Sequence, residues 1–112
     1  MPDDLDALAA NTLSRSALTK EQLQKEVDSL GSRWSIDGDH LKLELKGAPM
    51  AKCGAAAAHA AVLADELDHH PTIVLEYAGM TLTINTHDKK AITVLDLVFA
   101  ARLERWLRTA GW

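Results

Sequence analysis

The sequence predicts an α+β domain of two layers, in which a four-stranded antiparallel sheet carries three helices on one face. Two pairs of short alternating segments, each pair joined by a tight turn, predict two hairpins. Helical segments precede, separate and follow the hairpins, which gives the order helix-strand-strand-helix-strand-strand-helix. The length of 112 residues and an apolar content of 47% fit one domain with a packed core. We expect residues 16–112 to form it, and residues 1–15 to form a tail or a short helix.

The first helix is predicted to follow Thr19. Thr19 and Gln22 have the spacing of a capping box, in which each side chain bonds the other residue's backbone N–H. Apolar residues then recur at helical spacing as far as Leu30, and Gly31 is a suitable stop.

The first hairpin is predicted around Asp37-Gly38, a strong turn signal between two extended segments. In its second strand Leu41, Leu43 and Leu45 alternate with charged residues, so one face is expected to be buried and the other wet.

The middle helix is predicted from Ala51 to Leu67 or Asp68, because this segment consists largely of alanine and follows Pro49. Its small side chains should allow close packing on the sheet. We interpret His59, within this segment, as a packing or surface residue.

The second hairpin is predicted from strands 72–77 and 80–87, joined at Ala78-Gly79, with His87 on the polar face near the end of the strand. Thr93 and Asp96 then give a capping-box pattern for a last helix over about 94–109.

Charge and composition limit the possible functions. The net charge is −4 and the basic residues are scattered, which argues against a nucleic-acid partner. Cys53 is the single cysteine, so no intrachain disulfide can form, as is compatible with a reducing cytoplasm. Neither a signal-peptide pattern nor an apolar segment of about 18 residues is present. We therefore expect a soluble cytoplasmic protein without a membrane partner.

The candidate site begins at the end of the middle helix. Asp65 and His69 are four residues apart and share a helix face, while Pro71 disfavours helical geometry at His70. His87 ends a later strand, and in a compact domain these two ends can meet. Imidazoles titrate near neutral pH and can both give and take a proton, which favours proton-transfer chemistry.

Two other interpretations apply to the same residues. A histidine at a helix end can simply complement the helix dipole. Zinc could be bound by His69, His70, His87 and Asp65, although adjacent histidines rarely converge on one ion and no His-Glu-x-x-His helix is present. We expect no metal and no cofactor. Nucleophilic catalysis by Cys53 and nucleotide binding find no supporting motif.

These residues also resemble the signature of the pterin-4a-carbinolamine dehydratases, known as dimerisation cofactors of a hepatocyte transcription factor. In that pattern an acid precedes His-His-Pro, here Asp65 and 69–71. An aromatic follows six residues later (Tyr77), then a Thr-His pair ending ten residues on (Thr86-His87), and an acid nine residues further (Asp96).

The resemblance implies a fold and an activity. The family's fold has a four-stranded antiparallel sheet with three helices on one side, and its enzymes dehydrate 4a-hydroxytetrahydropterin to quinonoid dihydropterin in tetrahydrobiopterin recycling. It also implies self-association as a homodimer or homotetramer. A non-catalytic binding or assembly module is the alternative, because aromatics common at the middle helix start are missing and Trp112 is expected to be exposed.

The resemblance assigns residues to roles as well. The catalytic residues would be His69, His70, His87 and Asp65, with His69 and His87 moving protons and His70 holding the pterin. The substrate-binding residues would be Asp68, Pro71, Thr86, Asp88 and Trp34. Asp96 is expected to cap the last helix rather than to touch substrate.

Overall fold

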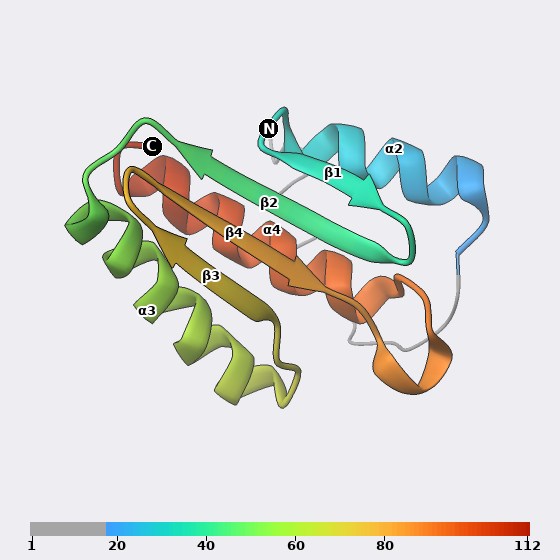
Figure 1. Ribbon diagram of the computed structural model, residues 1–112. Coiled ribbons are helices and arrows are strands. Elements are labelled where there is room, and N and C mark those ends of the chain that lie inside the picture. The colour runs from blue at the N-terminus through green and yellow to red at the C-terminus, as the bar shows by residue number, and fades with distance from the viewer. Residues whose placement is uncertain (1–17) are drawn as a thin grey trace.

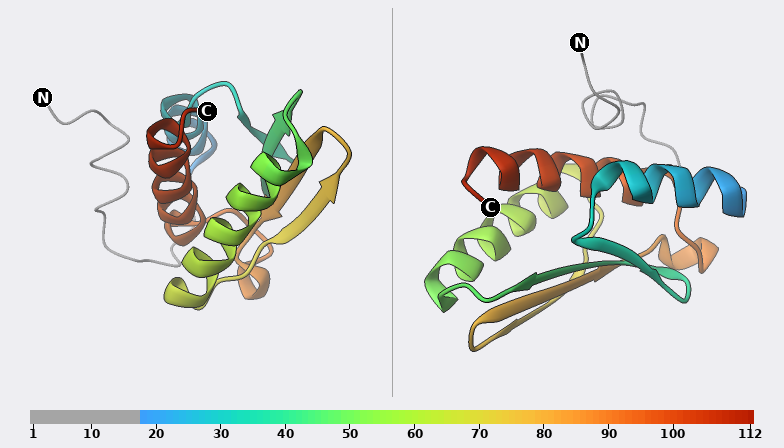
Figure 2. Two further views of the ribbon diagram at one scale, coloured as in Figure 1. Left: turned by 90° about the vertical axis from the view of Figure 1, so that its left-hand side faces the viewer. Right: turned by 90° about the horizontal axis from the view of Figure 1, so that it is seen from above.

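A computed structural model of the chain describes residues 18–112, so the tail or short helix predicted for residues 1–15 lies outside it. The elements follow the predicted order: α2 (Lys20–Leu30), β1 (Trp34–Asp37), β2 (His40–Lys46), α3 (Met50–Leu67), β3 (Thr72–Glu76), β4 (Gly79–Ile84), the 3₁₀ helix η1 (His87–Lys89) and α4 (Val94–Thr109). The strands pair antiparallel in the order β1-β2-β4-β3. All three α-helices cover one face of the sheet, which confirms the predicted fold class (Figures 1 and 2).

The hydrophobic core lies between this face of the sheet and the helices. The apolar side chains of the two central strands are buried, namely Leu41, Leu43 and Leu45 on β2 opposite Ile84, Leu82 and Met80 on β4. The residues that alternate with them lie on the uncovered face of the sheet. The helix α3 contributes mainly small buried side chains, such as Ala56 and Ala60, so that it packs closely.

Both predicted capping boxes are present. Thr19 accepts from the backbone N–H of Gln22, and the Gln22 side chain accepts from that of Thr19, at the start of α2. Thr93 and Asp96 form the same reciprocal pair at the start of α4. Because each box satisfies N–H groups that the helix leaves unpaired, these two helix starts could be read from the sequence alone.

The two hairpin loops are each displaced by one residue from the prediction. Asp37 pairs with His40, so the first loop is 38–39, with Gly38 at φ +63°. The second loop is 77–78 rather than 78–79, and Gly79 is already in β4. A Cβ on Gly79 would lie 3.1 Å from the carbonyl oxygen of Leu45, so this glycine allows close backbone approach instead of forming the turn.

The strand predicted to reach His87 ends at Ile84. The backbone N–H of Thr86 instead donates to the carbonyl of Ala91, at 2.9 Å, which closes a short loop. His87 therefore begins η1, and Lys90 takes a left-handed conformation at φ +50° to end it. This backbone contact between residues five apart cannot be recognised from alternation along a strand.

The C-terminal Trp112 was expected to be exposed, and this was wrong. It is half-buried against the core, and Lys52 Nζ lies 4.4 Å from its ring centroid, a cation–π contact. The guanidinium of Arg33 also donates to the carbonyl of Trp112, at 3.4 Å.

Candidate active site

The site begins where α3 ends and the chain turns inward. Asp68 adopts the left-handed conformation at φ +48°. Its N–H donates to the carbonyl of Asp65 at 3.4 Å, and the N–H of His69 donates to that of Ala64 at 3.0 Å. This is a Schellman motif, which satisfies the last carbonyls of the helix and reverses the chain; Pro71 follows, as is common after such caps. The reversal directs His69 into the protein.

His69 forms a buried pair with Asp96. His69 Nε2 lies 2.5 Å from Asp96 Oδ1, and the two side chains are 8% and 0% exposed. The other carboxylate oxygen of Asp96, Oδ2, accepts from the hydroxyl of Thr86 and from the backbone N–H of Thr93, both at 2.8 Å. Asp96 is also in the first turn of α4, where the helix dipole favours a negative charge.

His70 has a different environment from its neighbour. Its Nε2 lies 3.0 Å from Asp65 Oδ1, but the two side chains are 58% and 81% exposed. An ion pair this exposed contributes little stability, on the order of 0–1 kcal/mol. Asp65 therefore orients His70, which remains accessible to solvent. The pair adds little to the stability of the fold.

Three segments that are distant in sequence meet at this end of the molecule. They are the turn between α3 and β3, the loop after β4 and the N-terminus of α4, as both views show (Figures 1 and 2). The hydrogen bonds from His69 to Asp96 and from Thr86 to Asp96 join all three. His87 directly follows Thr86, begins η1 and is exposed.

The residues assigned to substrate binding fall into two groups. Asp68 and Asp88 are exposed and Pro71 is half-buried, all in the segments that meet at this end. Thr86 is also there, but the residue is 0% exposed, so it could not contact a ligand directly. Trp34 lies on β1, the edge strand farthest from β3 in the sheet, and its indole N–H donates to Glu104 at 3.0 Å.

The sequence did not indicate the contact between Asp96 and His69. Asp96 was expected to cap α4, and the capping box is present, but one carboxylate oxygen also bonds the imidazole. The capping box with Thr93 already explained why an acid stands at position 96. Nothing in the local pattern therefore suggested a long-range partner for it. Its place in the spaced signature was the only available signal.

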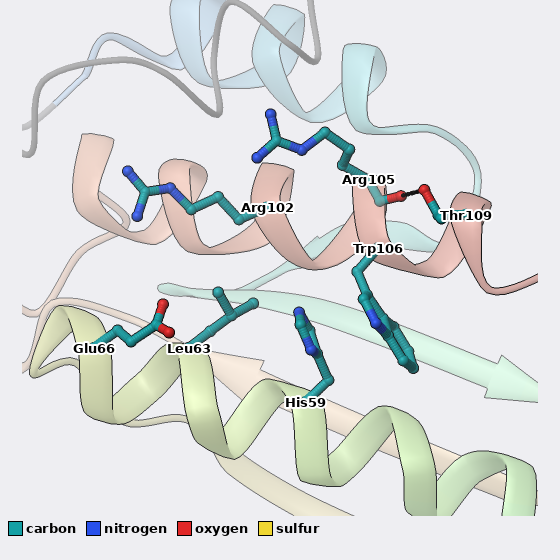
Figure 3. A pocket seen from close by; sticks show the side chains of 7 residues that line it. All are labelled: His59, Leu63, Glu66, Arg102, Arg105, Trp106 and Thr109. Carbon is teal, nitrogen blue, oxygen red and sulfur yellow. Dashed lines mark hydrogen bonds between the residues drawn. The ribbon is translucent and has the colours of Figure 1, made fainter.

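A hollow lies between α3 and α4 and is lined by none of the predicted site residues. Its volume is about 590 Å³, and its lining is His59, Leu63, Glu66, Arg102, Arg105, Trp106 and Thr109. The rings of His59 and Trp106 stack in it, with centroids 4.5 Å apart and planes 8° apart (Figure 3). Burial lowers the pKa of His59, and the nearby Glu66 partly opposes this. His59 is thus a packing residue, as predicted.

Neither a metal cluster nor a membrane span is found in the part of the chain that the structure describes. Within residues 18–112, no three His, Cys, Asp or Glu side chains converge closely enough to hold a metal ion. Over the same residues, none of the helices combines the length and the apolar character that a membrane span requires.

Comparison with known proteins gives matches over this same region. Residues 16–106 match the family model described as pterin 4 alpha carbinolamine dehydratase. A protein of Streptomyces avermitilis is 33% identical over 88 residues, covering 78% of this chain and 86% of its own length. One of Mesorhizobium japonicum is 28% identical over 96 residues, covering 84% of this chain and 97% of its own. Both carry the provisional name pterin-4-alpha-carbinolamine dehydratase.

A solved structure is similar to the fold described above. It is a transcriptional coactivator/pterin dehydratase from Brucella melitensis, 26% identical, with a TM-score of 0.72. The match covers 80% of this chain and 97% of that one.

Proposed function

The chain belongs to the pterin 4 alpha carbinolamine dehydratase family, and we propose that it converts 4a-hydroxytetrahydropterin to quinonoid dihydropterin in tetrahydrobiopterin recycling. The observation that carries the proposal is the buried His69–Asp96 pair. The exposed His70 is next to His69 in sequence, and Asp96 also bonds Thr86, the residue before the exposed His87. Relatives with the same provisional name support the reaction class.

The reaction needs one proton removed and one supplied. A base takes the proton from a pterin ring nitrogen, and the electron pair left behind forms a carbon–nitrogen double bond. The bond from that carbon to the hydroxyl oxygen breaks, and the oxygen leaves as water with a proton from an acid. Imidazoles can perform both transfers near neutral pH.

We assign roles to the site residues on this basis. His69 and His87 exchange protons with the substrate, and His70 holds the pterin. Asp65 orients His70, consistent with their 3.0 Å contact, or accepts a proton itself. Asp68, Pro71 and Asp88 border the bound pterin, while Thr86, which is fully buried, acts through its hydrogen bond to Asp96. Trp34 would affect the bound pterin only indirectly, because its indole N–H is bonded to Glu104.

A dehydration assay on synthetic carbinolamine tests the proposal. We expect His69→Ala and His87→Ala each to lower the rate by roughly 10²–10⁴-fold, the range for a general acid or base. His40→Ala is the matched control, because His40 is on β2 with its side chain 42% exposed and ion-paired with Asp39. If both site variants dehydrated the carbinolamine as fast as His40→Ala does, the assignment would fail.

We propose also that the protein is a homodimer or homotetramer in the cytoplasm. The strand β3 is an edge strand, and its outer residues Val74 and Leu75 are 44% and 38% exposed. Such an edge offers unpaired backbone groups to another chain. Sedimentation of the purified protein across a concentration series would give the oligomer, and a monomer at all concentrations would contradict this part of the proposal.

A non-catalytic binding module is the second candidate. The observation that favours it is Tyr77, which is 94% exposed at the tip of the second hairpin, next to the exposed residues of β3. Exposed aromatics of this kind are common at protein interfaces. The same assay separates the candidates, because a binding module would leave wild-type protein without dehydration activity.

A further inference from the structure

The buried hydrogen bonds around Asp96 form a closed ring that includes two threonines. We propose that Thr86 and Thr93 are positioning residues, which hold Asp96 so that it fixes the proton of His69 on Nε2 and leaves Nδ1 as the reactive nitrogen. The last step of this inference, proton exchange with substrate at Nδ1, depends on the proposed dehydratase function.

The distances determine which atom donates in each bond of the ring. Thr86 Oγ1 is 2.8 Å from Asp96 Oδ2, whereas Thr93 Oγ1 is 3.5 Å from it, so the Thr86 hydroxyl gives its proton to the carboxylate. A hydroxyl has one proton, so Thr86 must accept in its 2.6 Å contact with Thr93 Oγ1. Thr93 donates there, and its oxygen accepts from the backbone N–H of Asp96 in the capping box.

The ring therefore begins and ends at Asp96. The direction of donation is from Asp96 N–H to Thr93, from Thr93 to Thr86, and from Thr86 to the Asp96 carboxylate. The backbone N–H of Thr93 adds a second donor to the same oxygen, at 2.8 Å. Both groups bonded to Oδ2, the Thr86 hydroxyl and the Thr93 N–H, are donors. This arrangement suits an ionised carboxylate, which accepts at both of its oxygens.

The remaining oxygen of Asp96 then sets the tautomer of His69. Because Oδ1 accepts, His69 Nε2 must carry a hydrogen across their 2.5 Å contact. No hydrogen bond to His69 Nδ1 is formed within residues 18–112, yet among these residues no buried side-chain nitrogen or oxygen lacks a partner. It follows that Nδ1 lies at the protein surface, although the side chain as a whole is only 8% exposed.

The fold explains why two threonines are needed. Thr93 alone would cap α4, as many single Ser or Thr residues do. Thr86 comes from the loop after β4, and its backbone bond to Ala91 brings its hydroxyl beside the cap. The second hydroxyl thereby ties the carboxylate to the sheet as well as to its own helix, which restricts how Asp96 can rotate.

The first test compares Thr93→Val with Thr93→Ser. Serine keeps the hydroxyl and should keep kcat close to wild type. Valine has the same shape without the hydroxyl, so it loses the bonds to Thr86 and to the Asp96 N–H. It should lower kcat about tenfold per folded molecule, with KM little changed. Thr109→Val is the matched control, because within residues 18–112 the Thr109 hydroxyl bonds only the carbonyl of Arg105, at the other end of α4.

The second test reads the tautomer directly and needs no enzyme activity. Long-range ¹H–¹⁵N correlations of the His69 ring, in neutral form, should show hydrogen on Nε2 in wild type and in Thr109→Val. In Thr93→Val, the ¹⁵N shifts should move toward a mixture of tautomers. Hydrogen on Nδ1 in wild type would overturn the inference, as would a Thr93→Val protein that is less stable but unchanged in tautomer and in kcat.

These two readouts separate failure of this inference from failure of the proposed function. If wild-type protein did not dehydrate carbinolamine but showed the expected tautomer and its dependence on Thr93, the proposed function would be wrong and the positioning role would stand. If wild type were active and the tautomer did not depend on Thr93, only the positioning role would be overturned.

Discussion

The helix α4 buries two carboxylates, and their partners differ in kind. The Asp96 carboxylate, in the first turn, is 0% exposed and bonds one histidine, the hydroxyl of Thr86 and the backbone N–H of Thr93. Glu104, about two turns later, is 2% exposed. It accepts from Arg33 at 3.2 Å, from the indole of Trp34 at 3.0 Å and from Arg108 at 2.9 Å.

The partners decide what each acid can do. A guanidinium does not lose its proton in a protein, so the network around Glu104 can hold β1, α2 and α4 together but cannot exchange a proton. An imidazole can both give and take a proton, so the pair of Asp96 and His69 is the candidate for proton exchange. Equal burial on one helix therefore gives a structural contact at one place and a candidate catalytic contact at the other.

The largest effect on stability should follow from Glu104→Ala. The change leaves Arg33 and Arg108 without their carboxylate and the Trp34 indole without an acceptor, which should lower the free energy of unfolding by about 3 kcal/mol, the lower end for a broken buried ion pair. The lower end applies because the arginine side chains are 27% and 44% exposed. Urea denaturation followed by Trp fluorescence measures the change.

Turnover per folded molecule should be unaffected in Glu104→Ala. The folded fraction is obtained from the same denaturation curve and used to correct the measured rate. A large loss of corrected rate without loss of stability would contradict the assignment of a structural role to Glu104 and a catalytic role to Asp96.

The next effect should follow from Asp96→Asn, which keeps the size of the side chain and removes its charge. Asn cannot accept at both positions, so the orientation of His69 and the ring of hydroxyls are lost together. We expect the dehydration rate per folded molecule to fall roughly 100-fold, the lower end for impaired acid–base catalysis. The free energy of unfolding should change less than in Glu104→Ala. If Asp96→Asn and Glu104→Ala had comparable corrected rates, the two carboxylates would not differ in their catalytic role.

The smallest effect concerns His59, which stacks on Trp106 and has no carboxylate bonded to it, unlike His69. Its folded pKa is lowered from 6.5 by burial, so below about pH 6.5 the unfolded state binds more protons than the folded state. Stability from this group is therefore complete above that pH and declines as the pH falls toward the folded pKa.

A pH series of denaturation curves tests this expectation. His59→Phe keeps an aromatic stack without a titratable group, so its free energy of unfolding should fall less between pH 7 and 5 than that of wild type. Equal slopes for the two proteins would contradict the expectation.

The fold was predictable because its signals are local. Capping boxes at Thr19 and Thr93 marked two helix starts, and alternation along β2 and β4 marked the buried face. The second hairpin loop was displaced by one residue, because Gly79 serves a close contact with Leu45 on the neighbouring strand instead of forming the turn. The end of β4 was missed for the same kind of reason, since Thr86 bonds Ala91 rather than continuing the ladder.

The candidate site was predictable only in part. The spacing of Asp65, His69, His70 and His87 indicated proton-transfer residues at a helix end and a strand end. The bonds of His69 and Thr86 to Asp96 link the end of α3 to the loop after β4, but His87 lies in η1 and not at the end of a strand. The spacing did not distinguish the two adjacent histidines, although one is buried against Asp96 and the other is exposed beside Asp65. Their difference arises from the chain reversal at Asp68 and from the position of α4.

The sequence by itself determined the class of fold, the helix starts and the group of titratable residues, because periodicity, caps and spacing act over a few neighbouring residues. The tertiary structure alone decided which partners the buried acids have. Asp96 finds its histidine 27 residues away and Glu104 its indole 70 residues away. Contacts over such distances depend on how whole elements pack, and no local pattern encodes them.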